Sequence, residues 1–471
     1  MTEDELLGSN KLLAVKDMIV VLYGTDEAGE PTTVKARYSR EFEIYRGAAT
    51  GKDLESFSFE DRRIRLKGEE RLPMSDYAVV YFTSPTAGLM SATEVGKPYS
   101  ELTKAVSIED RMENGALRHS IYSNVSEPLK VTEEEMRRSG PSKTFEIAAT
   151  NLKALNGLVY LTIDPVMKDA AYYIPKDRIV ILRLNVTNKS LIPVPETEAV
   201  TLEDGTAVRL PKDANYDTTS LSEAGLKEQF YYHGEEWSFK HNYSTYTFTG
   251  TGLADNGKAD WVMAVPENTV SHHSLTSSTA TQLLLFVPVY PKSLLGEITD
   301  AKKETVSSSW LRVGEKEYLE PSFKEMYQAA AAVAESERSA EQQSIVEAGR
   351  ELAKLNPGYK APAAGEEPAY YAPTYSYHGA KVDYHVNGYV YYSIPVRHFD
   401  DAKQPDPGKD GRYGVVRNAL YYYHITGFTT LGATTPKQIN DGVRRYDEEV
   451  DATVGGPAFA DPDYLGRTLE L

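Results

Sequence analysis

The sequence predicts a mainly β protein built from β-sandwiches, with one helical insert late in the chain. Strand-length apolar runs recur without alternating helices, and this pattern favours sandwiches over parallel α/β sheets. Tyrosine is the dominant aromatic residue, with 33 Tyr against 13 Phe and 3 Trp, and its amphipathic ring suits pleated, half-exposed surfaces. The length of 471 residues is enough for roughly two to four domains, each with its own core.

The first set of strands opens with residues 17–23, a β-branched run that ends at a glycine. Residues 32–45 alternate after a turn signal, so we expect the two segments to form a hairpin. Residues 77–82 form a continuous apolar strand, and the helical spacing of apolar side chains predicts a helix at 99–108. Three further strands are expected in this set, at 117–122, 144–148 and 158–163.

The second set begins near residue 171 and contains the strongest strand signal of the chain, residues 178–186. Both faces of this segment carry apolar residues, as in a buried strand. The other strands expected here are 243–249, 261–265, 283–290, 389–394 and 420–426. We therefore predict two domains, 1–170 and 171–436, and a C-terminal tail, 437–471.

Residues 322–355 break the β pattern because they are rich in Ala and Glu. Ser322 and Glu325 have the spacing of a capping box, and an Asn-Pro-Gly sequence stops the segment. Its apolar positions are sparse, so we expect one or two exposed helices packed on a sheet of the second domain. A Tyr-rich loop, 369–377, follows and is interpreted as surface decoration.

The composition excludes several classes of function. A net charge of −18 repels phosphate backbones, and no nucleic-acid partner is expected. The chain has no cysteine, which removes disulfides, thiolate metal sites and thiol nucleophiles. No apolar run reaches the roughly 18 to 20 residues of a membrane helix, so we expect no transmembrane segment. Residues 1–13 lack the basic and apolar regions of a signal peptide, which is expected of a cytosolic protein or of a processed form without its leader.

The sequence shows no motif for catalysis or for cofactor binding. None of the nine His residues has a metal-ligand spacing, and neither a nucleophile elbow nor a phosphate-binding glycine loop occurs. The acidic stretch 400–411 lacks the spacing of a calcium loop and is interpreted as a solvated turn. We predict no catalytic, cofactor-binding or metal-ligating residues, no cofactor and no enzyme activity, although folding can still bring two carboxylates together.

The most specific segment is 411–436, GRYGVVRNALYYYHITGFTTLGATTP. A polar turn leads into an alternating strand, and Arg417 and Asn418 stand where a guanidinium and an amide can hold a loop by hydrogen bonds. The segment resembles the end of the second domain in the fimbrillin family, the type V pilins of Bacteroidales, and residues 388–393 are similar to the strand before it. The motif itself comprises Gly414, Val415, Val416, Arg417 and Asn418.

The resemblance extends in order over most of residues 12–436 and is greatest to the minor fimbrial subunit branch. It implies two β-sandwich domains in series, of transthyretin-like or Greek-key type, and a precursor exported as a lipoprotein. In this family a protease removes the first strand, and a strand of a neighbouring subunit fills the gap. We therefore expect the first domain to lack an edge strand and to present a polymerisation groove at Met18, Val20 and Leu22.

The C-terminus departs from the family pattern, because stalk subunits end in a valine-rich strand and a tryptophan, and no tryptophan follows residue 310. A donor segment within 437–471 would use Val450, Val454 and Phe459; the alternative is a tail packed on its own domain. The resemblance implies a structural subunit of a fimbria at the cell surface, attached to the outer membrane. It would polymerise with other fimbrial subunits by donor-strand exchange and support adhesion to host or bacterial receptors. The alternatives are a tip or accessory adhesin, a non-polymerising carbohydrate-binding surface lipoprotein, and a glycan-degrading sandwich enzyme.

Overall fold

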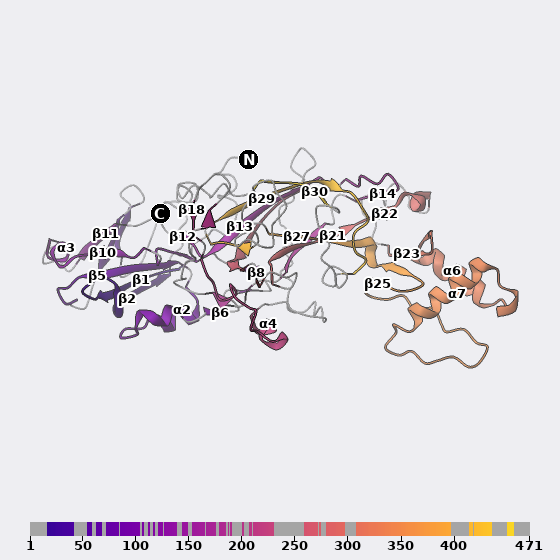
Figure 1. The fold of residues 1–471 in the computed structure, drawn as a ribbon, viewed down its shortest axis with the longest axis horizontal. Coiled ribbons are helices and arrows are strands. Elements are labelled where there is room, and N and C mark those ends of the chain that lie inside the picture. Colours follow the sequence, from indigo (N-terminus) through magenta and orange to yellow (C-terminus); the bar gives the residue numbers. More distant parts are fainter. Residues whose placement is uncertain are drawn as a thin grey trace.

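The structure is a computed structural model, and its described part is β-rich and elongated. An N-terminal sheet lies at one end, a pair of helices lies at the other, and the sheets that contain β13 and β21 lie between them (Figure 1). The prediction of a mainly β fold is therefore confirmed, whereas the sandwich domains and their boundaries stay predictions. With short interior gaps, the structure describes residues 17–41, 54–67, 72–138, 144–229, 259–296, 308–396, 414–435 and 450–455.

The N-terminal sheet has six strands in the order β12-β9-β5-β1-β2, with β10 also paired to β5. The predicted hairpin of β1 and β2 is confirmed, because the two strands pair antiparallel from Asp17 opposite Glu41 onward. Asp26 closes its turn by accepting hydrogen bonds from the backbone N–H groups of Ala28 and Glu30, both at 2.9 Å. The strands are β1 (Asp17–Thr25), β2 (Pro31–Glu41), β5 (Tyr77–Thr83), β9 (Tyr122–Ser123), β10 (Leu129–Val131) and β12 (Lys153–Ala154).

Both faces of the two central strands, β1 and β5, are buried. Ile19, Val21 and Tyr23 of β1 belong to a core that also takes Leu89 and Leu102 from the two short helices α2 (Ala87–Ala92) and η2 (Tyr99–Thr103). The predicted helix at 99–108 is wrong beyond Thr103, because Val106–Ser107 forms strand β6 and pairs with β16 (Lys189–Ser190). A separate antiparallel sheet joins β3 (Leu54–Ser58), β4 (Arg63–Lys67) and β11 (Thr144–Ala148).

The middle of the molecule contains two larger sheets that share one hydrophobic core. One sheet has the order β19-β13-β29-β30 and the other has the order β15-β21-β27. Their inward residues, such as Leu161 of β13, Tyr423 of β29, Leu285 of β21 and Tyr392 of β27, are all at most 1% exposed. The strands are β13 (Asn156–Ile163), β15 (Val180–Leu184), β19 (Ala259–Pro266), β21 (Gln282–Pro288), β27 (Tyr389–Pro395), β29 (Leu420–Phe428) and β30 (Val450–Gly455).

Strand β13 lies in the sheet of the C-terminal residues rather than in the N-terminal sheet. It pairs parallel with β29, from Leu158 opposite Leu420 to Ile163 opposite Ile425. Residues 158–163 were expected among the strands of the first domain, 1–170. Strand β13 instead pairs with C-terminal residues, so the predicted boundary at residue 170 comes after a strand of the central sheets. The predicted strand 243–249 lies outside the described residues.

The far end is a small module with its own core. A four-stranded sheet, β24-β23-β26-β25, packs against helices α6 (Glu320–Ala331) and α7 (Ala340–Ala353), and buried side chains of both helices form one cluster with this sheet. The capping box predicted at Ser322 is wrong, because α6 begins at Glu320 with Pro321 in its first turn. The capping box is at the start of α7 instead, between Ser339 and Gln342. The strands are β23 (Trp310–Val313), β24 (Lys316–Leu319), β25 (Tyr377–His378) and β26 (Asp383–His385).

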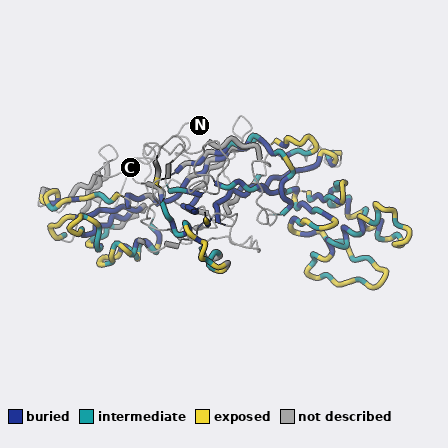
Figure 2. Tube along the Cα trace, viewed as in Figure 1, coloured by how far each residue is buried: buried dark blue, intermediate teal, exposed yellow. Residues whose placement is uncertain are grey.

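A buried aromatic junction connects this module to the central sheets. The rings of Trp310 and His385 stack with centroids 4.0 Å apart, and the Trp310 indole N–H donates to the carbonyl of Val289 at 2.8 Å. The Tyr290 hydroxyl bonds to the carbonyls of Ser308 and Asn387, both at 2.9 Å. Figure 2 shows buried chain through this connection and exposed loops beyond it.

The other described elements are short. They are β7 (Met112–Glu113), β8 (Ala116–Leu117), α3 (Glu133–Arg138), β14 (Tyr172–Tyr173), β17 (Val200–Thr201), β18 (Ala207–Val208), α4 (Glu223–Gln229), β20 (Asn268–Thr269), β22 (Tyr290–Pro291), η4 (Lys292–Gly296), η6 (Glu335–Glu337), η7 (Val386–Gly388) and β28 (Gly414–Val415).

Candidate functional site

The C-terminal motif begins with a close approach between two short strands. Gly414 and Val415 form β28 and pair antiparallel with Thr269 and Asn268 of β20. Gly414 has φ +129°, and a Cβ there would lie 2.5 Å from the carbonyl oxygen of Asn268. Only glycine avoids both the unfavourable backbone angle and this collision.

Arg417 holds the next turn of the motif through Glu267, which directly precedes β20. The backbone N–H and the Nε of Arg417 both donate to Oε1 of Glu267 at 3.0 Å, and Nε also reaches Oε2 at 2.8 Å. The Glu267 side chain is 1% exposed and that of Arg417 is 13% exposed. This guanidinium therefore fixes the loop before β29 by a buried, bidentate ion pair.

The motif also fixes the start of β29. The backbone N–H of Val416 donates to the hydroxyl of Tyr421 at 2.8 Å. A Cβ at Gly157 of β13 would lie 2.7 Å from the side chain of Val415 and 3.0 Å from the ring of Tyr421. Gly414, Val415, Val416 and Arg417 thus form a structural lock between β13, β20 and β29; Asn418 lies outside the described residues.

The groove expected at β1 is not at a sheet edge. Val20 pairs with Tyr38 of β2 on one side and with Tyr81 of β5 on the other, and Met18 and Leu22 are likewise flanked by both strands. Val20 is 3% exposed and Leu22 is fully buried. These three residues therefore do not lie at the edge of the described sheet, because β1 is a central strand that pairs with β2 on one side and with β5 on the other.

Strand β2 is the outermost described strand on that side of the sheet. Near its start, Val34 exchanges two backbone hydrogen bonds with the loop beside it, with Lys97 and Gly96 at 2.9 Å each. Farther along, the Arg37 guanidinium bonds to the carbonyl of Met90. The N-terminal half of this edge is thus covered by the chain itself.

The donor segment expected at the C-terminus forms strand β30. It pairs antiparallel with β29, from Tyr422 opposite Gly455 to Phe428 opposite Val450, with Val454 opposite Tyr423. Among the described strands, β30 ends its sheet and has β29 as its sole neighbour. The two valines therefore lie on an edge strand of the chain's own sheet, and Phe459 lies outside the described residues.

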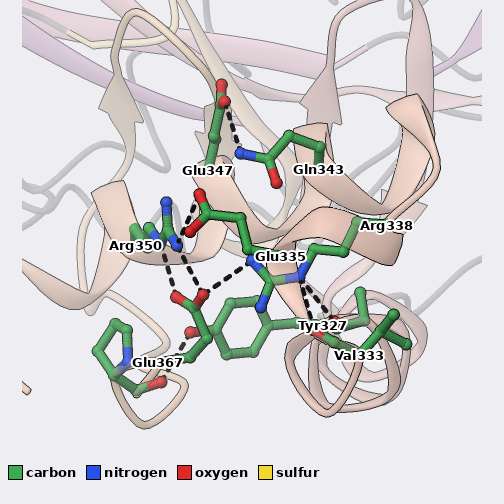
Figure 3. Close-up of polar contacts among 10 residues, drawn as sticks. Tyr327, Val333, Glu335, Arg338, Gln343, Glu347, Arg350 and Glu367 are labelled. Carbon is green, nitrogen blue, oxygen red and sulfur yellow. Dashed lines mark hydrogen bonds and ion pairs between the residues drawn. The ribbon is translucent and has the colours of Figure 1, made fainter. Parts of the chain in front are cut away.

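The distal module contains a buried charge cluster that holds the long loop 356–376 against the helices (Figure 3). The Glu367 carboxylate accepts hydrogen bonds from Nε and Nη2 of Arg350, both at 2.6 Å, and pairs with Arg338 at 2.9 Å. These bonds hold the pKa of Glu367 below its ordinary value, the bond from Arg350 being the largest cause. The Tyr327 hydroxyl donates to the carbonyl of Pro368 at 2.7 Å, and burial raises the pKa of Tyr327 to about 12.

The charge cluster is a structural tether, because the two guanidinium groups and the tyrosine all hold the loop. Within the described part of the chain, no group of three or more His, Asp or Glu side chains is arranged to hold a metal ion. No helix among these residues is long and apolar enough to cross a membrane.

Sequence reasoning missed Glu267 and a buried polar group beside it. No local pattern identifies Glu267, because its partner lies 150 positions away. The polar group includes Asp213 and Asn215, both buried, against Asn268 and Thr269 of β20. Its sequence signal is the D-x-N-x-D spacing of residues 213–217. Burial raises the pKa of Asp213 well above its ordinary value, and the nearby Glu267 carboxylate raises it further.

Comparison with solved structures finds weak similarity to three bacterial proteins, among others. A Bacteroides fragilis protein described as a cell adhesion protein is 8% identical with a TM-score of 0.25, over 94% of this chain and 85% of that chain. The fimbrial anchor protein Mfa2 of Porphyromonas gingivalis is 9% identical with a TM-score of 0.21, over 65% and 87%. A fimbrial assembly protein of Parabacteroides distasonis is 14% identical with a TM-score of 0.21, over 62% and 96%.

Comparison by sequence gives a match to one family. No curated protein matches the chain significantly. Residues 383–455 match the model of the C-terminal domain of fimbrillin, described as major fimbrial subunit protein type IV. The match contains β27, the motif at β28, and strands β29 and β30. Residues 383–455 are therefore a fimbrillin C-terminal domain.

Proposed function

We propose that the protein is a structural subunit of a bacterial surface fimbria that polymerises by strand exchange after proteolytic maturation and supports adhesion. Members of the fimbrillin family are structural fimbrial proteins and not enzymes, which supports the fimbrial role. The proposal places the chain at the cell surface, in a fimbria attached to the outer membrane. Its partners are other fimbrial subunits and, through adhesion, receptors on host or bacterial surfaces.

The observation that carries the mechanism is the position of β30. A strand of six residues at the edge of a sheet has one ladder of hydrogen bonds, so it can leave without breaking a second one. Its departure exposes the backbone of β29, and the released strand can form a ladder of similar length on a sheet edge of another subunit. The two states have similar hydrogen bonds, so the free energy of exchange depends on side-chain burial in the accepting subunit.

We propose that the accepting edge is the outer side of β2 after Arg37. The covered half of that edge ends at the contacts of Val34 and Arg37. Residues 38–41 continue the strand and pair with β1 on the inner side. A strand from a second subunit added there would extend the sheet by β-augmentation.

Two truncations of the full chain test the role of β30. Deletion of 446–471 removes the strand, whereas deletion of 456–471 keeps β30 and removes Phe459 and the rest of the tail. We expect polymers, detected by electron microscopy and gel filtration, from the second variant and not from the first. Circular dichroism checks that both remain folded, and a synthetic 446–459 peptide should inhibit polymerisation of the intact protein. Polymers from both variants, together with no effect of the peptide, would refute strand donation by β30.

A tip or accessory adhesin is the second candidate, and the distal module favours it. This module lies at the end of the molecule farthest from the N-terminal sheet (Figure 1), and Tyr375 on its loop is 47% exposed. Immunogold labelling separates the two roles: labels along the fibre indicate a shaft subunit, and labels at one end indicate a tip subunit. A carbohydrate-binding surface lipoprotein would bind a glycan array without forming fibres.

A further inference from the structure

The buried polar group beside the C-terminal motif contains two oxygen atoms with no hydrogen-bond donor. Asp213 is 6% exposed and Asn215 is fully buried. Among the described residues, Oδ2 of Asp213 and Oδ1 of Asn215 are both buried and without a partner. A buried acceptor that lacks a donor is destabilising, and a charged one is more so. Two such atoms, on side chains two positions apart in the sequence, therefore indicate a missing ligand.

The hydrogen bonds that do form cannot satisfy the Asp213 carboxylate. Its Oδ1 accepts from the backbone N–H of Asn215 at 2.9 Å and lies 3.2 Å from the Thr269 hydroxyl. That hydroxyl has one proton and lies closer to the carbonyl of Pro211, at 2.7 Å. An ionised carboxylate has about four acceptor positions, so one firm donor leaves most of them empty.

The orientation of the Asn215 amide is set by its neighbour. Asn268 donates both amide hydrogens, to the carbonyl of Thr279 at 2.9 Å and to the Thr281 hydroxyl at 2.8 Å. Its oxygen therefore faces Asn215, whose Nδ2 donates to it at 3.3 Å. Turning the Asn215 amide over would bring two oxygens together, so its Oδ1 must point away from Asn268.

No described basic side chain neutralises Asp213. Arg417 is committed to Glu267, and the ammonium of Lys212 lies over the ring of Tyr216, 5.4 Å from its centroid. The neighbouring Glu267 carboxylate adds negative charge to the same region. The side chains of Asp213 and Asn215 both contact β20, at Thr269 and Asn268 respectively.

We propose that Asp213 and Asn215 bind a divalent cation of the calcium class. Both orphan atoms are hard oxygen ligands, and Ca²⁺ accepts carboxylate, amide and backbone oxygens at flexible geometry, with water completing its shell. Asp217 completes the D-x-N-x-D spacing of the first ligands in many calcium loops. It is exposed, so it lies at the solvent side of the loop, where its charge attracts cations. The proposed site has one buried carboxylate and one amide, so it is not a cluster of three acidic or His side chains.

The cation would tie the loop 211–221 to the lock formed by β20 and β28. This loop already contacts the same region, since the backbone N–H of Ser271 donates to the carbonyl of Tyr216 at 2.8 Å and that of Thr218 donates to the Ser274 hydroxyl at 2.9 Å. If the protein is exposed on the cell surface, as proposed above, extracellular calcium would occupy a site of about 10⁻⁴–10⁻³ M affinity. The site itself does not depend on that function.

Thermal unfolding of the full chain, in EDTA or in excess CaCl₂, tests the proposal. We expect calcium to raise the melting temperature by about 5 °C, and MgCl₂ to raise it less. Asp213→Asn should abolish the rise, because it removes the charge and replaces the orphan acceptor with a donor. Glu27→Gln removes one exposed charge from the β1–β2 turn and should keep the full rise, which controls for general effects of calcium on an acidic protein.

Two further measurements keep the test decisive if Asp213→Asn folds poorly. Asn215→Asp adds a second buried carboxylate, so we expect a lower melting temperature in EDTA and a larger rise in calcium than in the wild-type chain. Terbium, excited through Tyr216, should luminesce in the wild type and in Glu27→Gln, and about tenfold less in Asp213→Asn. No calcium-dependent rise in the wild type, or an equal rise in Asp213→Asn, would overturn the proposal. If calcium does not stabilise the wild-type chain and its stability increases on acidification, the two oxygens share a proton instead of binding a cation.

Discussion

Removal of Arg417 tests whether the C-terminal motif is a structural lock. Glu267 is 1% exposed, so Arg417→Ala leaves a carboxylate buried without its cation and without the donors that satisfy it. Breaking a buried ion pair by removing one partner costs about 3–5 kcal/mol. The lock lies where β20, β28 and β29 meet, so we expect this loss in the free energy of unfolding of the central sheets.

The double variant Arg417→Met with Glu267→Leu distinguishes the lock from a simple loss of contacts. It removes both charges, so the desolvation cost disappears, and we expect its stability to lie within about 2 kcal/mol of the wild-type value. Urea unfolding followed by tryptophan fluorescence and circular dichroism measures all three variants. Lys316→Ala is the control, because its ion pair with Glu341 is 63% and 50% exposed and its loss should leave stability unchanged. A double variant that loses as much stability as Arg417→Ala, or more, would refute the reasoning.

Three further predictions concern the distal module. Burial lowers the pKa of His385 from 6.5 to about 4, so the unfolded chain binds the proton first as pH falls. Stability should then decline between pH 6.5 and 4 by about 3 kcal/mol, and His385→Gln should remove this component from urea unfolding curves measured across that range. Gly349→Ala places a Cβ 2.1 Å from the ring of Tyr327 and should cost about 2 kcal/mol. Limited proteolysis should then cut the loop near Pro368 faster, because the displaced tyrosine no longer holds it. Ser339→Ala removes the capping box of α7 and should lower the free energy of unfolding by about 1 kcal/mol, whereas Ser339→Asp should restore it.

The local sequence pattern was sufficient to predict the strands whose alternate side chains face one core. The alternation in residues 420–426 places Tyr421, Tyr423 and Ile425 inward, and all three are at most 1% exposed. The β1–β2 hairpin follows from two strand signals around a short turn, with Asp26 in the position that closes it. In both cases the information is local in the sequence, where backbone geometry and side-chain period act directly.

The errors arise where distant residues decide the structure. Residues 17–23 were assigned to a sheet edge by the family resemblance, although an uninterrupted apolar run is the pattern of a strand covered on both sides, and β1 is such a strand. The start of α6 was placed at Ser322, but Pro321 is compatible with the first helical turn and allows the helix to begin earlier. Glu267 had no signal of its own because burial of a carboxylate depends on a guanidinium far away in the sequence.

The fimbrillin match covers a segment that does not form a core by itself. Its strand β27 lies beside β21, and its strand β29 lies beside β13, which precedes it by about 260 positions. The shared hydrophobic core takes Leu161 and Leu285 from outside the match as well as Tyr392 and Tyr423 from within it. This arrangement is compatible with the proposed exchange of β30. Because β29 keeps its parallel ladder with β13 and its start remains fixed by the Arg417–Glu267 pair, release of β30 opens one edge while the core beneath it stays closed.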